Sequence, residues 1–161
     1  MTVRLAETRD FPDILKIYDR ARRFMAENGN PTQWPPSYPS AELLREDMEE
    51  GHLFVVTDKE QVRGVFSFLV GPDHTYERIE DGAWHSDREY GTIHRIAGDG
   101  SGGIFDACLA YCKSKCDYLR IDTHENNKVM QHVVTKNGFR RCGIIYTDNG
   151  TPRIAFDRME A

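Results

Sequence analysis

The chain has 161 residues, of which 29% are charged and 39% hydrophobic, and its net charge is −5. This length predicts a single domain, residues 1–161, with a sizeable buried core. No apolar run approaches the roughly 20 residues of a membrane-spanning helix, and the Lys and Arg clusters of a nucleic-acid surface are missing. The opening MTVRLAETRD has no apolar secretory core, so we expect a cytoplasmic protein that uses neither nucleic acid nor membrane.

The first half of the chain predicts a strand, two helices and an antiparallel hairpin of two further strands. The expected ranges are 3–6 for the strand, 11–28 and 41–50 for the helices, and 52–58 and 62–71 for the hairpin. Ser40 is the expected cap of the second helix. Between the helices, residues 30–39 hold four prolines, which prevents regular structure and leaves Trp34 and Tyr38 on a loop. We predict that both line a substrate pocket, with a core role as the alternative for Trp34.

The second half predicts a strand, a helix, a strand, a helix and a final hairpin. The expected ranges are 92–97, 104–112, 118–123 and 126–137, with the hairpin strands on either side of 148–150. The pair Asn149-Gly150 favours a tight primed turn. The polar insertion at 72–89 shows no clear period. The predicted order is therefore β-α-α-β-β-β-α-β-α-β-β, with one parallel βαβ unit in an otherwise antiparallel sheet.

The cysteines predict packing and not metal chemistry. Cys108, Cys112 and Cys116 lie four residues apart, on one face of a helix, and Cys142 follows later. No second CxxC motif or matching His pair completes a tetrahedral zinc set. We therefore expect the cysteines to act as small buried hydrophobes, and we expect no metal site.

The glycine-rich loop GDGSGG, residues 98–103, stands between a predicted strand and a predicted helix. Glycine permits positive φ and close approach of a ligand, and the first amides of a helix are unpaired, so the loop predicts a phosphate cradle. Gly98, Gly100 and Gly103 also spell the dinucleotide motif G-x-G-x-x-G, and Asp122 follows 19 residues later. A dinucleotide fold needs more parallel units than the chain predicts, but this alternative stays open.

The order of elements and the segment NNKVMQHVVTKNGF, residues 126–139, resemble the GCN5-related N-acetyltransferase (GNAT) family over nearly the full length. In that family an Asn eleven residues before the Gly of a GF pair lies near the coenzyme, which points to Asn127 before Gly138. Met130 stands at the family's small apolar position. The resemblance implies an α/β acyl-CoA acyltransferase fold, with a mixed, mostly antiparallel sheet of about seven strands, a central parallel βαβ unit and four helices.

The resemblance also implies acetyl-CoA as co-substrate. Its pyrophosphate would bind amides of the glycine loop, and its pantetheine arm would lie between the strands at 92–97 and 118–123. The amide of Ile96 or Ala97 would polarise the thioester carbonyl. The expected cofactor-binding residues are Ile96, Ala97, Gly100, Ser101, Gly102, Gly103, Ile104, Phe105, Asn127 and Met130. The loop departs from the family pattern, because Gly100 replaces the usual Gln or Arg and Phe105 replaces a small residue.

The catalytic residues are the least defined part of the resemblance. Val134 stands where the family often has a Tyr that protonates the leaving thiolate, so another acid, water or direct thiolate departure must serve. Candidates for catalysis are His94, Glu77 and Tyr146, and Tyr76 joins Trp34 and Tyr38 as substrate-binding. His94 lies two residues before Ile96, which predicts that both side chains point the same way. A structural role is the alternative for His94.

The expected activity is direct transfer of acetyl from acetyl-CoA to a primary amine. The expected partner is a small-molecule or peptide amine, whose identity the sequence leaves open along with homodimer formation. A second function stays open because of Val134: a non-catalytic module that senses acyl-CoA.

Overall fold

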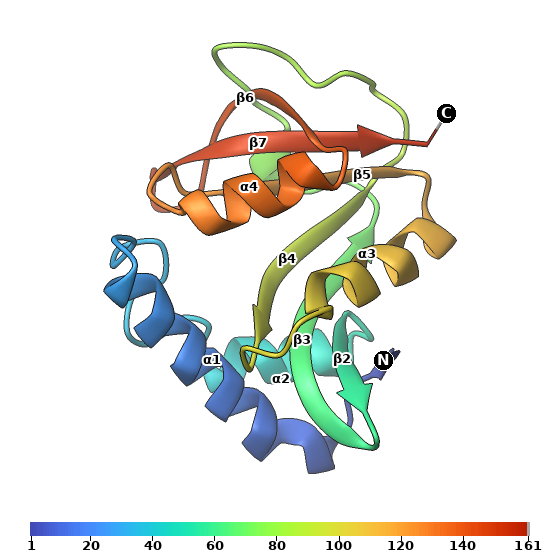
Figure 1. Ribbon diagram of the computed structural model, residues 1–161. Coiled ribbons are helices and arrows are strands. Elements are labelled where there is room, and N and C mark those ends of the chain that lie inside the picture. The colour runs from blue at the N-terminus through green and yellow to red at the C-terminus, as the bar shows by residue number, and fades with distance from the viewer. Residues whose placement is uncertain (161) are drawn as a thin grey trace.

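A seven-stranded sheet runs through the protein, and helices lie on both of its faces (Figure 1). The structure is a computed structural model that describes residues 1–160. The strands are β1 (Thr2–Leu5), β2 (Leu53–Asp58), β3 (Gln61–Val70), β4 (Gly91–Gly98), β5 (Tyr118–Thr123), β6 (Arg140–Tyr146) and β7 (Pro152–Met159). The helices are α1 (Phe11–Glu27), α2 (Ala41–Glu49), α3 (Ile104–Lys115) and α4 (Lys128–Lys136), with short 3₁₀ turns at Thr8–Asp10 and His74–Tyr76. The predicted order of elements is confirmed.

The strands follow the order β1-β2-β3-β4-β5-β7-β6, and every neighbouring pair is antiparallel except β4 and β5. The predicted fold class is thereby confirmed. The last strand of the chain lies between β5 and β6, so the final hairpin forms one edge of the sheet. A single parallel pair is not the doubly wound parallel sheet that the dinucleotide alternative requires.

The two parallel strands stay together for only two residue pairs, Gly91 with Leu119 and Thr92 with Arg120. Beyond these pairs β4 diverges from β5, as Figure 1 shows. The inner edges of both strands are therefore left without ladder partners over the rest of their length. Buried, unpaired backbone groups are costly, which makes this opening a natural place for a ligand with amide groups.

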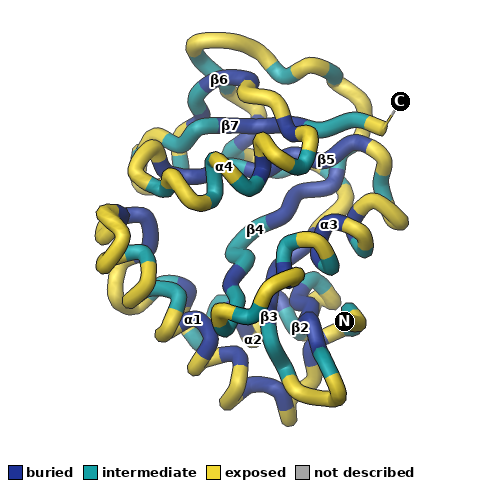
Figure 2. Tube along the Cα trace, viewed as in Figure 1, coloured by how far each residue is buried: buried dark blue, intermediate teal, exposed yellow. Residues whose placement is uncertain are grey.

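Two apolar clusters hold the helices to the sheet. One cluster joins the sheet to α3 and α4 and includes Cys108, Cys112 and Val134, all with 0% exposure. The other joins the sheet to α1 and α2 and includes Ile14 and Leu44. Figure 2 shows the buried positions gathered along the middle strands. The core role predicted for the helical cysteines is confirmed for Cys108 and Cys112.

The final turn differs from the predicted primed turn. A type I′ turn needs two consecutive residues with positive φ, whereas Gly150 alone has one here, at 81°. The chain makes a longer turn, in which Gly150 N donates to Thr147 O at 2.8 Å. The Asn149 carboxamide oxygen accepts from the Thr151 amide, which supports this longer form.

Among the helices within residues 1–160, none is both long and apolar enough to cross a membrane.

Candidate active site

A cavity of about 520 Å³ lies where β4 and β5 separate. Its walls come from the loop between α1 and α2, from the segment after β3, from the turn between β6 and β7, and from the start of α4. Among its lining residues are Gln33, Trp34, Tyr38, Asp73, Ile93, His94, Arg95, Ile96, Thr123, Asn127, Met130 and Arg153. The volume falls within the range of small-molecule sites.

A β-bulge in β4 shapes the cavity wall. His94 pairs with Ser67 and Ala97 with Val65, so Arg95 and Ile96 have no partner residue in β3. Arg95 has a φ of 53°, a left-handed conformation that costs free energy in a residue other than glycine. The bulge breaks the two-residue alternation. The alternation predicted to place His94 and Ile96 on one face is therefore interrupted: Ile96 packs against the apolar cluster on the α3 side, although both residues line the cavity.

The strained residue is held in place by contacts at both ends. Its carbonyl accepts a hydrogen bond from the Tyr18 hydroxyl at 2.7 Å. Its guanidinium donates to Asp47 at 2.6 Å and to the Tyr38 hydroxyl at 3.3 Å. Tyr18 is fully buried, and its pKa is raised by that burial, so the phenol stays a neutral donor. The bulge at Arg95 is thus a fixed feature of the site.

His94 reaches the cavity from β4 and forms a dyad with Asp73. Nε2 of His94 lies 2.7 Å from Oδ2 of Asp73, while Oδ1 of Asp73 accepts from the amide and hydroxyl of Thr75. Burial alone would raise the pKa of Asp73, but the hydrogen bonds from His94 and Thr75 outweigh it and hold the pKa well below its usual value. An ionised Asp73 favours the His94 tautomer that carries its proton on Nε2 and its lone pair on Nδ1.

The loop between α1 and α2 is tied to the far side of the opening by Gln33. The Oε1 atom of this buried residue accepts from Nδ2 of Asn127 at 3.1 Å and from Nδ2 of Asn30 at 2.8 Å. Its carbonyl accepts from Arg153 at 2.9 Å. Trp34 is only 8% exposed and packs edge-on against Tyr18, yet it also lines the cavity. Trp34 therefore packs in the core and lines the cavity at the same time, so its two expected roles are compatible.

Asn127 is the N-cap of α4. Its Oδ1 accepts from the Met130 amide at 3.0 Å, which satisfies one free donor of the first turn. Asn127 and Met130 both line the cavity. Val134 is buried in the core one turn further along and does not line the cavity.

The glycine loop leads from the end of β4 into α3. Gly103 is the N-cap with a φ of 87°, and Gly100 has a φ of 94°. Among residues 1–160, the amides of Gly102, Gly103 and Ile104 have no hydrogen-bond acceptor, whereas the Ser101 amide donates to Asp99 at 2.9 Å. Three free amides at a helix start suit an anion. The loop does not line the cavity but stands at the end of the strand that does.

Arg20 of α1 is a functional candidate that the sequence did not reveal. A Cβ atom on Gly100 would lie 2.5 Å from its guanidinium, and Nη1 reaches toward the Gly98 carbonyl at 3.5 Å. The side chain thus places a positive charge beside the free amides of the loop. Arg63 also lies near the loop, but it pairs with Asp99 at 3.2 Å. Only the three-dimensional fold brings α1 to this loop.

Several predicted residues do not join His94 in the cavity. Tyr76 is 2% exposed, and its hydroxyl donates to Asp122 at 2.6 Å; burial raises its pKa. Glu77 is exposed at the end of a 3₁₀ turn. The Tyr146 hydroxyl donates to Glu80 at 3.0 Å and does not line the cavity. Ala97 and Ile104 direct their side chains into the core, so only their backbones are available to a ligand, and the partly buried Phe105 side chain packs against that core.

The comparison with solved structures gives the decisive result. An acetyltransferase of the GNAT family from Streptococcus agalactiae matches with a TM-score of 0.90 and 27% identity, over 99% of this chain and 95% of that one. The chain belongs to the GNAT family. No protein-family profile and no curated protein matches the sequence.

Other GNAT-fold structures are more distant and support the fold alone. A ribosomal-protein-alanine N-acetyltransferase from Brucella melitensis has a TM-score of 0.63 at 18% identity, over 99% of this chain and all of that one. The NatC complex bound to Gag peptide and CoA has a TM-score of 0.62 at 15% identity, with both chains fully covered. These structural neighbours of our GNAT protein are acetyltransferases.

Proposed function

We propose that this GNAT protein is an N-acetyltransferase that moves the acetyl group of acetyl-CoA directly to a primary amine. The observation that carries the proposal is the position of the His94–Asp73 dyad on the wall of the cavity where β4 and β5 separate. The glycine loop with its free amides stands at the end of the same strand. One end of the site thus suits a phosphate group and the other suits proton transfer.

The fit to acetyl-CoA rests on three features of the chain. The amides of Gly102, Gly103 and Ile104 would hold the pyrophosphate, with Arg20 beside them. The separated edges of β4 and β5 offer backbone donors and acceptors to the amide groups of the pantetheine arm. Asn127 and Met130 would close the opposite wall.

Bound acetyl-CoA would supply an activated thioester, whose C–S bond breaks as the amine nitrogen attacks its carbonyl carbon. The bulge leaves Ile96 without a partner residue in β3. Its amide would donate to the carbonyl oxygen as negative charge develops. Nδ1 of His94 would take the proton that the amine loses. Since Val134 has no proton to donate and Tyr146 does not line the cavity, the departing sulfur would take its proton from water.

The proposed acceptor is a small-molecule or peptide amine that enters past Trp34 and Tyr38. Two fold neighbours carry names that point to peptide or protein acceptors, which favours neither class for this chain at 15% and 18% identity. We propose one acetyltransferase domain at residues 1–161, acting in the cytoplasm without nucleic acid or membrane.

Release of free thiol from acetyl-CoA, measured with a panel of amines and peptides, tests the proposal. We expect release that depends on one class of amine and exceeds the rate without amine. The sensor alternative predicts that acetyl-CoA raises the melting temperature while no amine promotes thiol release. Failure of acetyl-CoA to bind at all would contradict both functions.

A further inference from the structure

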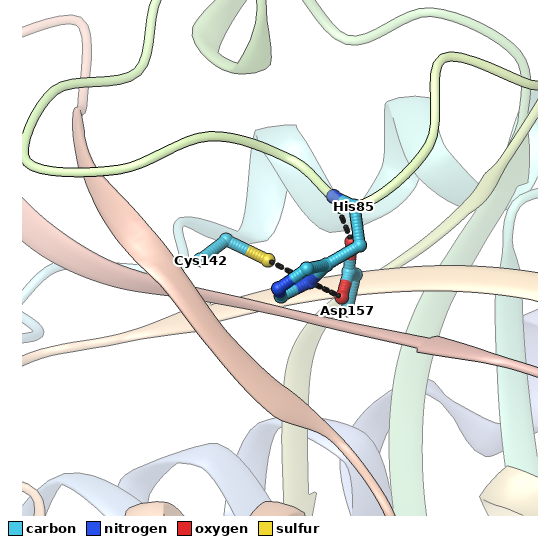
Figure 3. A group of neighbouring side chains, drawn as sticks. All are labelled: His85, Cys142 and Asp157. Carbon is cyan, nitrogen blue, oxygen red and sulfur yellow. Dashed lines mark hydrogen bonds and ion pairs between the residues drawn. The ribbon is translucent and has the colours of Figure 1, made fainter.

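A second group of reactive side chains lies outside the cavity, at the edge of the sheet formed by β6 and β7. His85 from the polar insertion, Cys142 from β6 and Asp157 from β7 bring their ligand atoms within 4.8 Å of one another. Figure 3 shows the three side chains pointing toward one another. Nδ1 of His85 lies 2.6 Å from Oδ1 of Asp157 and 3.4 Å from Sγ of Cys142.

This group is not arranged for nucleophilic catalysis. A Cys-His-Asp relay needs the thiol on one ring nitrogen and the carboxylate on the other, whereas both contact Nδ1 of His85 here. Burial, together with Asp157, raises the pKa of the Cys142 thiol to about 12. A buried neutral thiol is a poor nucleophile. A cation that replaced the shared proton would reverse this balance, because it stabilises the thiolate directly.

The surrounding structure holds the three residues in place. Oδ2 of Asp157 accepts from the His85 amide at 2.9 Å and from the Tyr118 hydroxyl at 2.8 Å, which leaves Oδ1 facing the other two ligand atoms. Glu80 and Ile144 form an isolated bridge that fastens the insertion to β6. Such outer hydrogen bonds are typical of metal ligands, whose orientation they fix.

We propose that His85, Cys142 and Asp157 bind one divalent transition-metal ion of the zinc type. An imidazole, a thiolate and a carboxylate match the ligand preferences of zinc. Tetrahedral zinc bonds would separate sulfur from nitrogen by about 3.6 Å and nitrogen from oxygen by about 3.4 Å. The first spacing is already present, and the second requires the 2.6 Å pair to widen as the metal takes the place of its proton.

Binding of the ion has a defined proton balance. The thiol proton of Cys142 leaves to solvent, and the proton between Nδ1 and Oδ1 moves to Nε2 of His85 or to solvent. The His85 side chain is 32% exposed, so water can reach the ion and complete its shell. The ion would link the polar insertion to both strands of the final hairpin. The sequence did not reveal the group, since His85 is 57 positions from Cys142 and 72 from Asp157.

Titration of the untagged protein with Co²⁺ tests the proposal, because thiolate ligation gives an intense near-ultraviolet charge-transfer band. We expect the band to saturate at one equivalent and to disappear on addition of Zn²⁺. Cys142→Ala should abolish the band. Cys116→Ser is the matched control, since Cys116 is a partly exposed cysteine outside the group, and it should leave the band unchanged.

A second variant covers the case in which Cys142→Ala does not fold. His85→Gln changes a partly exposed side chain and should weaken Co²⁺ binding at least tenfold, with a normal circular dichroism spectrum in the absence of metal. Absence of the Co²⁺ band in the wild-type protein would overturn the proposal. A band that survives in folded Cys142→Ala, or unchanged affinity in His85→Gln, would place the metal elsewhere and overturn it equally.

Discussion

The carboxylate of Asp73 holds Nε2 of His94 at 2.7 Å, although the two residues lie 21 positions apart in the chain. Asp73 belongs to the segment that follows β3, and His94 precedes the bulge in β4. The antiparallel pairing of these strands brings them together. The pair therefore connects the polar insertion with the candidate site of acetyl transfer.

Replacing His94 tests its role as a base. His94→Gln should lower turnover by about a hundredfold to ten-thousandfold, because the amine would lose its proton acceptor. Acetyl-CoA binding should be nearly unchanged. The rate should also lose the pH dependence that an imidazole base confers. Steady-state rates against pH, with melting temperature on the same preparation, measure both effects. If His94 were only structural, His94→Gln would instead lower the melting temperature and leave the rate of the folded fraction unaltered.

Asp73 should contribute to stability in a pH-dependent way. Its folded-state pKa lies below the unfolded value, so its stabilising effect is present above about pH 4, the unfolded value, and is lost as the pH falls through the folded pKa. The difference in unfolding free energy between wild type and Asp73→Asn should therefore shrink as the pH is lowered from about 6 to about 2. Most of the change should occur below the unfolded pKa of about 4. Urea unfolding across this range measures it. A difference that grows in acid would contradict the ionised carboxylate.

The glycine loop allows a test with matched variants. A Cβ atom on Gly102 would meet no atom within 4 Å, and its φ is not in the left-handed range, so a side chain there is tolerated. Gly102→Asp should weaken CoA binding by about tenfold or more, because the carboxylate would repel the pyrophosphate. Gly102→Asn has nearly the same shape without the charge and should bind more tightly than Gly102→Asp. Calorimetry gives both affinities; equal values would show that the phosphates bind elsewhere.

Arg20 should strengthen phosphate binding through its charge. Arg20→Gln should lower CoA affinity and reduce the dependence of that affinity on salt, since a partly exposed ion pair is screened. Arg23→Gln is the control, because Arg23 lies on the same helix and pairs with Asp19 at 3.4 Å. The CoA affinities of the two variants, measured at two salt concentrations, distinguish the role of Arg20 from that of Arg23. Parallel behaviour of both variants would mean that Arg20 acts only through net charge.

The sequence predicted the elements well because their signals are local. The apolar period of α1, the Ser40 cap of α2 and the β-branched runs of β2 and β3 lie within single segments. The features it missed depend on distant contacts. The bulge at Arg95 is held by Tyr18 and Asp47, and the Asn149-Gly150 turn follows side-chain hydrogen bonds of Asn149.

The residues of the candidate site likewise fall into those that a local motif marks and those that only the fold brings together. Asn127 and Met130 could be found because a motif of the family marks them, and both line the cavity. Asp73, Gln33 and Arg20 belong to no such motif, and only the folded chain brings them to the site. Glu77 and Tyr146 were proposed from sequence position alone, and the fold places neither on the cavity wall.

Cofactor choice gives a further prediction. Acetyl-CoA should raise the melting temperature and NAD should not, because the sheet has one parallel pair and not a dinucleotide fold. Ligand at 100 times its dissociation constant stabilises a protein by about 2.7 kcal/mol, which a thermal scan detects readily. Stabilisation by NAD and not by acetyl-CoA would contradict the assignment of the glycine loop to CoA.

Transfer of a labelled acetyl group tests the central claim most directly. Protein, deuterated acetyl-CoA and the amine that best promotes thiol release are incubated together, and the products are analysed by mass spectrometry. We predict that the deuterated acetyl group appears on the amine nitrogen in an amount equal to the free thiol, and that His94→Gln forms this product at least a hundredfold more slowly. Label that stays on acetyl-CoA, or that appears only as free acetate, would contradict amine acetylation by this protein.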